Sequence, residues 1–275
     1  MKILYLTNIP SPYRVDFFNE LGKYCELIVL FERESAGDRD KRWKANNYKN
    51  FKAIFLNGKK IGTDASVSPH VIRYLKNGYD AIILGGYSSP TYMIAIDYMR
   101  IRGIPFFLNA DGGFIKEDNK LLYKIKKHYI GGASGWLSTC KGTDDYLLYY
   151  GAKKDCIFHY PFTSVMESDL FYMAEEDKQQ IKKQLCIDEK KMVITVGQFI
   201  PRKGFELLIQ AAGKISKDYG IFVIGGKPGK EYLDIQKECG ATNVHFMDFM
   251  EKEQLKRYYL AADLFVFPTK EDIWG

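Results

Sequence analysis

Apolar and polar residues alternate along this chain in blocks that predict a strand, then a helix, then another strand. The apolar run Lys2–Thr7 is typical of a buried strand, and it is followed by a loop and a helix from Tyr13 to Leu21. The same pattern predicts strands at 25–30, 51–56, 80–84, 105–108, 135–138 and 156–159, and helices at 67–76, 92–102, 121–129 and 143–150. The charged stretch 32–50 is expected to be an exposed loop. Strands that alternate with helices pair in parallel, so the first half has an α/β architecture.

The second half repeats this architecture. Residues 162–169 lack periodicity and are expected to link the halves, and a polar helix at 175–185 follows. Strands are then predicted at 192–196, 221–224, 244–247 and 264–267, with helices at 205–215, 232–238 and 252–261. We therefore expect a domain at 1–164, a linker with its leading helix at 165–190, and a second domain at 191–275.

Composition narrows the class of protein. Of the 275 residues, 46% are hydrophobic and 27% are charged, as in a soluble globular protein. No apolar run approaches the ~20 residues of a membrane span, and the first residues lack the features of a signal peptide. Five scattered cysteines fit free thiols in a reducing cytoplasm. The net charge of +6 suits an anionic ligand or an anionic membrane surface better than a nucleic acid.

The segment Met192–Ala212 carries the most specific chemistry. A short β-branched strand is followed by Gly197, then by the adjacent cations Arg202 and Lys203, and then by a helix that begins near Phe205. Parallel sheets bind ligands beyond the carboxyl ends of their strands, and a diphosphate is the commonest anion at such a strand-to-helix junction. The alternative is that the two cations belong to a solvated loop.

Two places in the first half are further candidates. Ser11, Tyr13 and Arg14 follow the first strand and are candidates to contact phosphates or an acceptor, although a turn set by prolines with Tyr13 starting the helix explains the same residues. Asp111 follows a predicted strand and precedes two glycines, so its carboxylate is expected at the same edge of the sheet. The alternative for Asp111 is an ordinary Asp-Gly turn.

A basic amphipathic segment lies at Lys116–Tyr129, where lysines alternate with leucine, isoleucine and tyrosine. A helix of this kind can rest on an anionic bilayer. It can equally pack its apolar face on its own sheet and turn its lysines to solvent.

The end of the sequence departs from the pattern. The apolar strand near Leu264 runs into residues 269–275 without the crossover helix that normally covers a parallel strand. We expect that the second domain is shortened, or that the last strand is covered by something outside this chain.

Four segments together resemble a GT-B glycosyltransferase of the family 4 type: MKILYLTNIPSPYRVDFFNEL, VGQFIPRKGFELLIQA, IFVIGGKPG and VHFMDFMEKEQLKRYYLAADLFVFPTKEDIWG. The resemblance implies two Rossmann-like domains, the second incomplete at its C-terminus. It implies a nucleotide-diphosphate sugar as donor, with no other cofactor and no metal, because cationic side chains neutralise the diphosphate. It further implies that the anomeric configuration of the sugar is retained.

The resemblance assigns roles residue by residue. Arg202 and Lys203 would meet the diphosphate, with Gly197 beside it, whereas the usual arginine after that glycine is replaced by Gln198. Alignment of the last motif puts its first acid, which contacts the donor sugar, on Asp272, with Glu271 as a close contender. The second glutamate of that motif would lie past the last residue. In the first domain, the resemblance places Asp111 near the transferred sugar.

We therefore expect a hexosyltransferase, cytoplasmic or peripheral at the inner face of the cell membrane, that moves sugar to a saccharide or lipid-linked acceptor in the synthesis of cell-surface polysaccharide or glycolipid. Domain closure would exclude water and protect the donor from hydrolysis. Two alternatives remain open: a shortened, non-catalytic nucleotide-binding protein, and a nucleotide-sugar epimerase of the same fold. A dinucleotide oxidoreductase is disfavoured, since no G-x-G-x-x-G follows the first strand.

Overall fold

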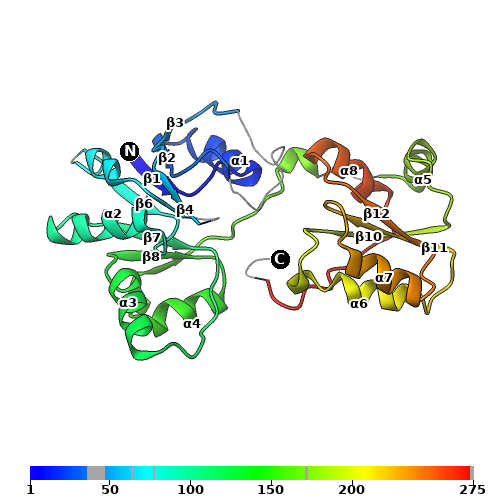
Figure 1. Ribbon diagram of the computed structural model, residues 1–275. Helices are drawn as coiled ribbons and strands as arrows, with labels where there is room; N and C mark the ends of the chain where they lie inside the picture. Colours follow the sequence, from blue (N-terminus) through cyan, green and yellow to red (C-terminus); the bar gives the residue numbers. More distant parts are fainter. Residues whose placement is uncertain (36–46, 63–64, 77, 171–172, 273–275) are drawn as a thin grey trace. The chain divides into compact units, whose positions relative to one another are not determined.

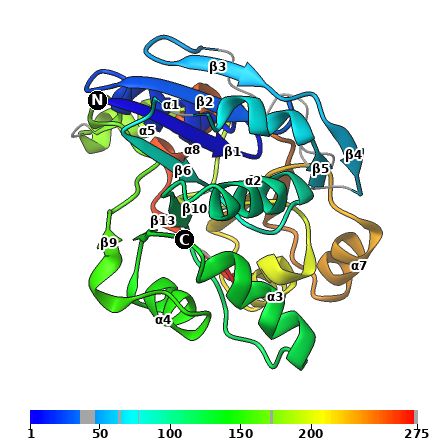
Figure 2. The same ribbon diagram turned by 90° about the vertical axis from the view of Figure 1, so that its left-hand side faces the viewer.

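The computed structural model describes residues 1–35, 47–62, 65–76, 78–170 and 173–272, and it divides the chain into two compact units, Met1–Asp169 and a second that begins at Leu170. Each unit is built on its own parallel sheet with helices on both faces (Figures 1 and 2). Parallel neighbours need long crossover connections, and the helices in those connections cover the sheet. The predicted α/β class with two Rossmann-like units is confirmed.

The first unit has a seven-stranded sheet in the order β3-β2-β1-β6-β7-β8-β9, with every neighbouring pair parallel. Its strands are β1 (Lys2–Thr7), β2 (Glu26–Phe31), β3 (Lys52–Phe55), β6 (Ala81–Leu84), β7 (Phe107–Ala110), β8 (Gly135–Ser138) and β9 (Ile157–His159). A small antiparallel pair, β4 (Lys59–Ile61) and β5 (Ala65–Val67), stands beside it. The helices are α1 (Pro12–Leu21), α2 (Pro90–Ile101), α3 (Lys120–Ile130) and α4 (Lys141–Tyr149), with short 3₁₀ turns at Pro69–Tyr74, Lys154–Cys156 and Glu167–Asp169.

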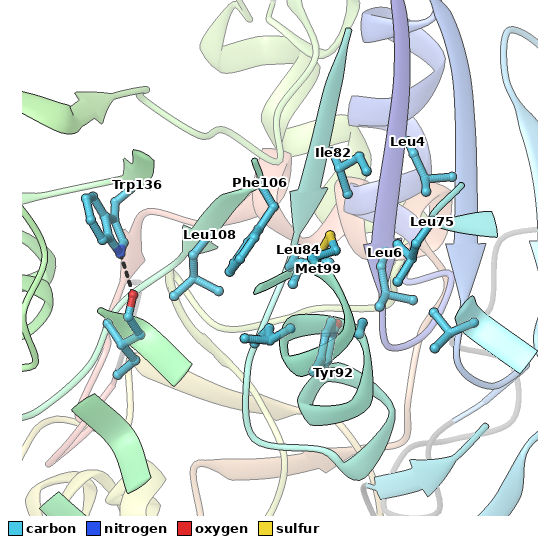
Figure 3. Close-up of a cluster of buried hydrophobic side chains, with 14 of the residues drawn as sticks. Leu4, Leu6, Leu75, Ile82, Leu84, Tyr92, Met99, Phe106, Leu108 and Trp136 are labelled. Atoms are coloured by element: carbon cyan, nitrogen blue, oxygen red, sulfur yellow. Dashed lines mark hydrogen bonds between the residues drawn. The ribbon is translucent and has the colours of Figure 1, made fainter. Parts of the chain in front are cut away.

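Alternate residues of the strands fill two separate cores. Leu4 and Leu6 of β1 pack with Leu84, Leu108 and Trp136 against α2, α3 and α4. Figure 3 shows side chains of this cluster, with Leu84 beside the helix that carries Tyr92 and Trp136 farther to the left. The indole N–H of Trp136 donates to the carbonyl of Ile130 at 2.9 Å, the dashed line in Figure 3. The intervening residues of β1 face the opposite side. The strand period of two thus places Tyr5 beneath α1, where its ring lies 4.9 Å from that of Phe18.

The second unit has a four-stranded parallel sheet in the order β12-β11-β10-β13. Its elements are α5 (Glu175–Gln184), β10 (Lys191–Val196), a 3₁₀ turn η4 (Pro201–Lys203), α6 (Phe205–Ala212), β11 (Tyr219–Ile224), α7 (Lys230–Glu238), β12 (Val244–Met247), α8 (Lys252–Ala261) and β13 (Leu264–Phe265). One apolar core joins the sheet to α6 and α7, and the other joins it to α5 and α8 (Figure 1).

In both sheets, the order in which the chain adds strands reverses beside the first strand of the unit. The chain moves outward from β1 to β2 and β3 and then returns to β6 on the other side of β1. It does the same around β10, with β11 and β12 on one side and β13 on the other. The loops after the two central strands therefore diverge, and such a switch point at the carboxyl edge is where α/β sheets bind ligands.

Several sequence predictions need correction. The pair β4 and β5 was not predicted, and the segment expected as a helix at 67–76 forms a 3₁₀ turn. The strand expected at 105–108 lies at Phe107–Ala110, and β13 is shorter than expected. The expected exposed loop 32–50 begins with two buried residues, Glu32 at 1% and Arg33 at 6% exposure, while its positions 36–46 lie outside the described residues. Among the described helices, none has the length and apolarity to cross a bilayer.

Asp263 joins three elements of the second unit just before β13. Its carboxylate accepts from Lys178 and Lys182 of α5, each at 2.7 Å, and from the backbone N–H of Met192 in β10 at 2.8 Å. Burial disfavours the charge, but these donors outweigh burial and lower the pKa of Asp263 well below its ordinary value. The Lys182 side chain is 3% exposed, so the carboxylate also neutralises a buried ammonium group.

We expect Asp263→Asn to reduce the free energy of unfolding by about 3 kcal/mol, since it leaves the buried charge of Lys182 without its counter-ion. Because the folded pKa of Asp263 is depressed, its stabilisation is present above about pH 4 and is lost as pH falls below that value. Urea unfolding of the full chain followed by circular dichroism measures both effects. Asp218→Asn is the matched control, because its pair with Lys190 is exposed and contributes under about 1 kcal/mol. Equal losses for the two variants would contradict the assignment.

Candidate functional site

The first candidate site lies in the second unit, at the end of β10. The N–H of Gly197 donates to the carbonyl of Ile224 at 2.9 Å, which continues the pairing of β10 with β11 by one residue. A Cβ at position 225 would lie 1.9 Å from the carbonyl oxygen of Gly197, and Gly225 has a φ of +146°. A side chain there would separate the two strand ends. The glycines therefore keep the backbone after both strands closely packed beside the Lys203 side chain, whose Cδ is 3.5 Å from a Cβ built on Gly197.

The two predicted cations both bind the carboxylate of Asp272. Arg202 Nη1 lies 3.2 Å from Asp272 Oδ1, and Lys203 Nζ forms a hydrogen bond and ion pair with Oδ2. Arg202 also donates to the backbone carbonyl of Glu271 at 3.2 Å. The Lys203 side chain is only 13% exposed, against 42% for Arg202, and its ammonium lies 5.0 Å from the centre of the Phe267 ring. The Lys203 side chain is therefore packed within the protein, which contradicts the alternative of a solvated loop for this residue.

A glycine explains how residues so far apart in sequence meet. Gly204 adopts a left-handed φ of +66°, and a Cβ there would lie 2.2 Å from the carbonyl oxygen of Pro268. Only glycine tolerates both conditions without strain. The chain after β13 thus packs on η4, where the N–H of Lys270 donates to the carbonyl of Arg202 at 2.9 Å. This contact brings Glu271 and Asp272 to the cations.

The start of α6 carries a second ion pair. Lys270 Nζ bonds to Glu206, whose carboxylate lies in the first turn of the helix. Burial opposes the charge of Glu206, but the hydrogen bond from Lys270 prevails, so the pKa of Glu206 is lowered. Gln198, the other residue singled out in this segment, places its carbonyl within 2.9 Å of the N–H of Ile200 and shapes the loop before η4.

The second candidate site lies in the first unit and joins Arg14 to Asp111. Arg14 stands in the first turn of α1, and Asp111 directly follows β7. Their side chains form an ion pair in which the Arg14 side chain is 7% exposed and the Asp111 side chain 38% exposed. The guanidinium carbon also lies 4.6 Å from the centre of the Phe162 ring. Burial opposes the charge of Arg14, while nearby Tyr5 and Asp111 favour it, and the net effect raises the pKa of Arg14.

Two further side chains hold the other carboxylate oxygen of Asp111. Asn109 Nδ2 donates to Oδ1 at 2.9 Å, and the Tyr160 hydroxyl donates to the same oxygen at 3.1 Å. Thr139 Oγ1 donates to the backbone carbonyl of Asp111 at 3.1 Å. Burial, together with the charge of Asp111, raises the pKa of Tyr160 to about 12. The phenol therefore stays protonated and remains a donor at neutral pH.

The other two candidates of the first unit, Ser11 and Tyr13, take part in the start of α1 and in its packing. Ser11 is 3% exposed and occupies the N-cap position of α1, while Pro12 begins the helix. Tyr13 is half-buried, and its ring packs edge-on against Phe162 at 5.8 Å between centroids. The helix begins at Pro12, one residue before the start that the proline-turn alternative gave it, and Arg14 is the member of the group that joins Asp111.

Sequence reasoning missed Asn109, Tyr160 and Phe162 in the first unit and Lys270 in the second. A signal was available for Tyr160, since it directly follows the last strand of its half and so reaches the same edge as Asp111. Phe162 falls in the segment interpreted as a linker, yet it is 8% exposed and packs against Arg14.

Residues 177–275 match the family model described as glycosyl transferases group 1. Among curated proteins, an uncharacterised glycosyltransferase of Methanocaldococcus jannaschii is 30% identical over 108 residues, which is 38% of this chain and 28% of that protein. A GDP-mannose-dependent alpha-(1-6)-phosphatidylinositol monomannoside mannosyltransferase of Mycobacterium tuberculosis is 24% identical over 110 residues, which is 38% of this chain and 29% of that protein. The matched region thus spans less than a third of the length of these relatives.

Solved structures resemble the whole chain. Anabaena HepE, crystallised with UDP and glucose, superposes with a TM-score of 0.75 at 14% identity, over 99% of this chain and 75% of HepE. WaaG, a glycosyltransferase involved in lipopolysaccharide biosynthesis, gives a TM-score of 0.68 at 14% identity, over 98% of this chain and 75% of WaaG. A UDP-N-acetylglucosamine 2-epimerase gives 0.58 at 13% identity, over 96% of this chain and 73% of the epimerase. Residues 177–275 are thus similar to the group 1 glycosyltransferases, and both units share the fold of GT-B glycosyltransferases such as HepE and WaaG.

Proposed function

We propose that this protein is a hexosyltransferase that takes a sugar from a nucleotide-diphosphate donor and passes it to a saccharide or lipid-linked acceptor, in the synthesis of a cell-surface polysaccharide or glycolipid. The observation that carries the proposal is the convergence of Arg202 and Lys203 on a single carboxylate, at the switch point of the second sheet. The named relatives add support, since one is described as GDP-mannose-dependent and HepE was crystallised with UDP-glucose.

Asp272 marks the place where an anion is held. Its two carboxylate oxygens are shared between the two cations, one oxygen each. A diphosphate presents negative oxygens with similar spacing and more charge, so the same pair of cations can bind it. In the transfer step, the leaving nucleotide gains negative charge, and fixed cations stabilise that charge as it develops. We propose that these side chains do so without a metal ion and that the sugar keeps its anomeric configuration.

Lys203→Ala is expected to weaken UDP binding roughly 10- to 100-fold, because a hydrogen bond between charged groups contributes about 1.5–3 kcal/mol. Isothermal titration of the full chain with UDP and GDP measures the loss. Lys214→Ala is the matched control, since Lys214 is exposed beyond the opposite end of α6. Equal affinities for the Lys203→Ala variant and the unaltered chain would remove Lys203 from the diphosphate site.

Asp272→Asn separates two roles of that carboxylate. The Asp272 carboxylate competes with a diphosphate for the same cations. The Asp272→Asn variant, which lacks this negative charge, is therefore expected to bind UDP about three- to tenfold more tightly. If Asp272 also contacts the donor sugar, the gain should shrink for UDP-glucose and GDP-mannose. Asp234→Asn, which removes an exposed partner of Lys230, should leave all these affinities unchanged. Weaker UDP binding by Asp272→Asn would contradict the competition.

The exposed face of α3 supports a membrane-bound acceptor. Leu121, Leu122 and Ile125 are 69%, 40% and 38% exposed, and Lys120, Lys124 and Lys127 are exposed beside them. The helix packs on its own unit through Tyr123, Lys126, Tyr129 and Ile130. Lys126 is not part of the exposed basic face expected from the sequence, because its ammonium bonds to Asp118 at 2.9 Å. We propose that the remaining leucines, isoleucine and lysines contact an anionic lipid surface.

Leu121→Glu together with Leu122→Glu should abolish binding to vesicles that contain phosphatidylglycerol, since the change removes apolar contact and adds negative charge. Co-sedimentation with such vesicles, and with vesicles of phosphatidylcholine alone, measures the effect. Leu233→Glu changes a leucine of α7 that is 46% exposed and is the control. Binding by the double variant as strong as by the control would rule out this face.

An epimerase of the same fold is the second candidate, and incubation with donor alone separates it from a transferase. An epimerase forms a changed nucleotide-sugar without any acceptor, whereas a transferase releases free nucleotide only as it moves the sugar to an acceptor or to water.

A further inference from the structure

A hollow of about 550 Å³ lies at the amino edge of the first sheet, where β1, β2 and β3 begin. Figure 2 marks this edge by the label N at the start of β1. Arg14 and Asp111 follow the carboxyl ends of strands in the same parallel sheet, so they lie at the opposite edge. The volume is within the range of ~300–1,000 Å³ that is typical of sites for small molecules. Residues that line this amino-edge hollow include Lys2, Glu26, Ile28, Lys49, Asn50 and Lys52.

The charge of the amino-edge hollow is positive. Three lysines line it, Lys2, Lys49 and Lys52, against the single carboxylate of Glu26. Lys2 pairs with Glu26 at 3.1 Å, but the Glu26 side chain is 65% exposed, so water can replace this pairing at little cost. Within the part of the chain that the structure describes, the ammonium groups of Lys49 and Lys52 have no acidic partner. Cations gathered in a hollow without counter-ions attract an anion from solution.

The loop that carries Lys49 is fastened to α1 by side-chain amides. Asn19 Oδ1 accepts from the backbone N–H groups of Lys49 at 2.8 Å and Asn50 at 3.3 Å. Asn19 Nδ2 donates to the carbonyl of Asn47 at 2.8 Å. Asn50 Nδ2 donates in return to the carbonyl of Asn19 at 2.9 Å. These four hydrogen bonds fix the backbone before β3, so a ligand that binds Lys49 does not have to order this loop first.

Close packing fixes the same loop from below. A Cβ at position 22, just after α1, would lie 1.9 Å from the carbonyl oxygen of Asn50, so a side chain there would displace the loop. Phe51 is 9% exposed, and its ring lies 5.6 Å from that of Phe18 in the core beneath α1. Lys52 then begins β3. Lys49 and Lys52 are thus positioned by contacts of the folded unit, as the cations of a preformed site are.

The residues of the hollow favour phosphate over other anions. Lysine presents a compact point charge with three donors, which suits the oxygens of a phosphate, whereas the planar guanidinium of arginine matches a carboxylate better. The hollow contains lysines and no arginine among its lining residues. Its volume leaves room for more than one phosphate group, and the partly exposed Ile28 offers an apolar wall. A diphosphate that belongs to a small molecule therefore fits the hollow better than a single inorganic ion.

We propose that the amino-edge hollow is a second anion site, which binds the diphosphate group of a small molecule through Lys49 and Lys52, with Lys2 as a third cation once Glu26 turns to solvent. The inference does not depend on the proposed function. A molecule bound here is held at the edge away from Arg14 and Asp111, so it is not a reactant at their site.

An NMR titration of the full chain with inorganic pyrophosphate alone tests the proposal through the backbone amide signals of Asn50 and Lys52. Lys49→Gln together with Lys52→Gln should weaken binding at this site at least about tenfold, because each change removes a hydrogen bond between charged groups. Lys59→Gln together with Lys60→Gln is the matched control. It removes two exposed lysines of β4 in the same unit, outside the hollow, and should leave the affinity unchanged.

Glu26→Gln gives a change in the opposite direction. It removes the carboxylate that competes for Lys2, so pyrophosphate should bind about threefold more tightly. Thermal melting establishes that each variant is folded, and if the Lys49 and Lys52 double variant is not, Glu26→Gln decides. Three results would each overturn the proposal: unmoved amide signals of Asn50 and Lys52 at millimolar pyrophosphate, equal affinities of the two double variants, or weaker binding by Glu26→Gln.

Lys203→Ala separates this site from the one in the second unit. That variant should bind pyrophosphate at the amino-edge hollow as tightly as the unaltered chain does, whatever it loses in affinity for UDP. Because the amide signals report each site by itself, a failure of UDP binding at Lys203 and a failure of pyrophosphate binding at Lys49 are distinguishable.

Discussion

Parallel strand pairing is the constraint on which the rest of this structure depends. Because all strands of a sheet point the same way, every loop that leaves a carboxyl end reaches the same edge, however distant the residues are in sequence. In this way Arg14, at the start of the helix after β1, meets Asp111 and Tyr160 from the loops after β7 and β9. In the second unit, the loops after β10 and β13 meet for the same reason, since those two strands are neighbours.

Close backbone contacts then set the finer geometry. Gly204 lets the carbonyl of Pro268 approach η4, and Gly225 lets the end of β11 approach Gly197. In both places the space for a side chain is taken by main-chain atoms, which are rigid. The position of Lys203 relative to Asp272 thus follows from packing that a single methyl group would disturb. Asp263 adds a second restraint, because it fastens α5 and β10 to the residue that precedes β13.

Much of this fold could be predicted from the sequence because its strands are short apolar runs with clear boundaries. Lys2–Thr7, Gly135–Ser138 and Val244–Met247 coincide with strands of the structure. The β4–β5 pair was missed because its strands are only three residues long and β4, which contains Lys59 and Lys60, is exposed throughout. Glu32 was expected in solvent because charge usually indicates exposure. In the structure, hydrogen bonds from Ser66 and Ser89 compensate its burial, and burial raises its pKa.

The residues of the candidate sites also differ in how far the sequence could predict them. Arg202 and Lys203 are adjacent in sequence and follow a strand, so a local pattern could identify them. Tyr160 lies 49 residues from Asp111, and only the strand order joins them. For Lys126 the local pattern was wrong. Helical spacing predicted it on the exposed basic face of α3, but in the structure its ammonium bonds to Asp118, eight residues away. Local periodicity predicts elements well, whereas the partner of a charged side chain is a property of the tertiary fold.

An arginine paired with an aspartate occurs in both units, and burial decides what each pair can do. Arg202 is 42% exposed, so water can solvate its guanidinium when Asp272 is exchanged for another anion, whereas Lys203, at 13% exposure, needs the new anion to replace the charge of Asp272. Arg14 is 7% exposed, so removal of Asp111 would leave an uncompensated buried charge, at a cost of about 3–5 kcal/mol. The first pair is therefore suited to bind and release an anionic ligand. The second is suited to remain intact and to hold the start of α1 against the loop after β7.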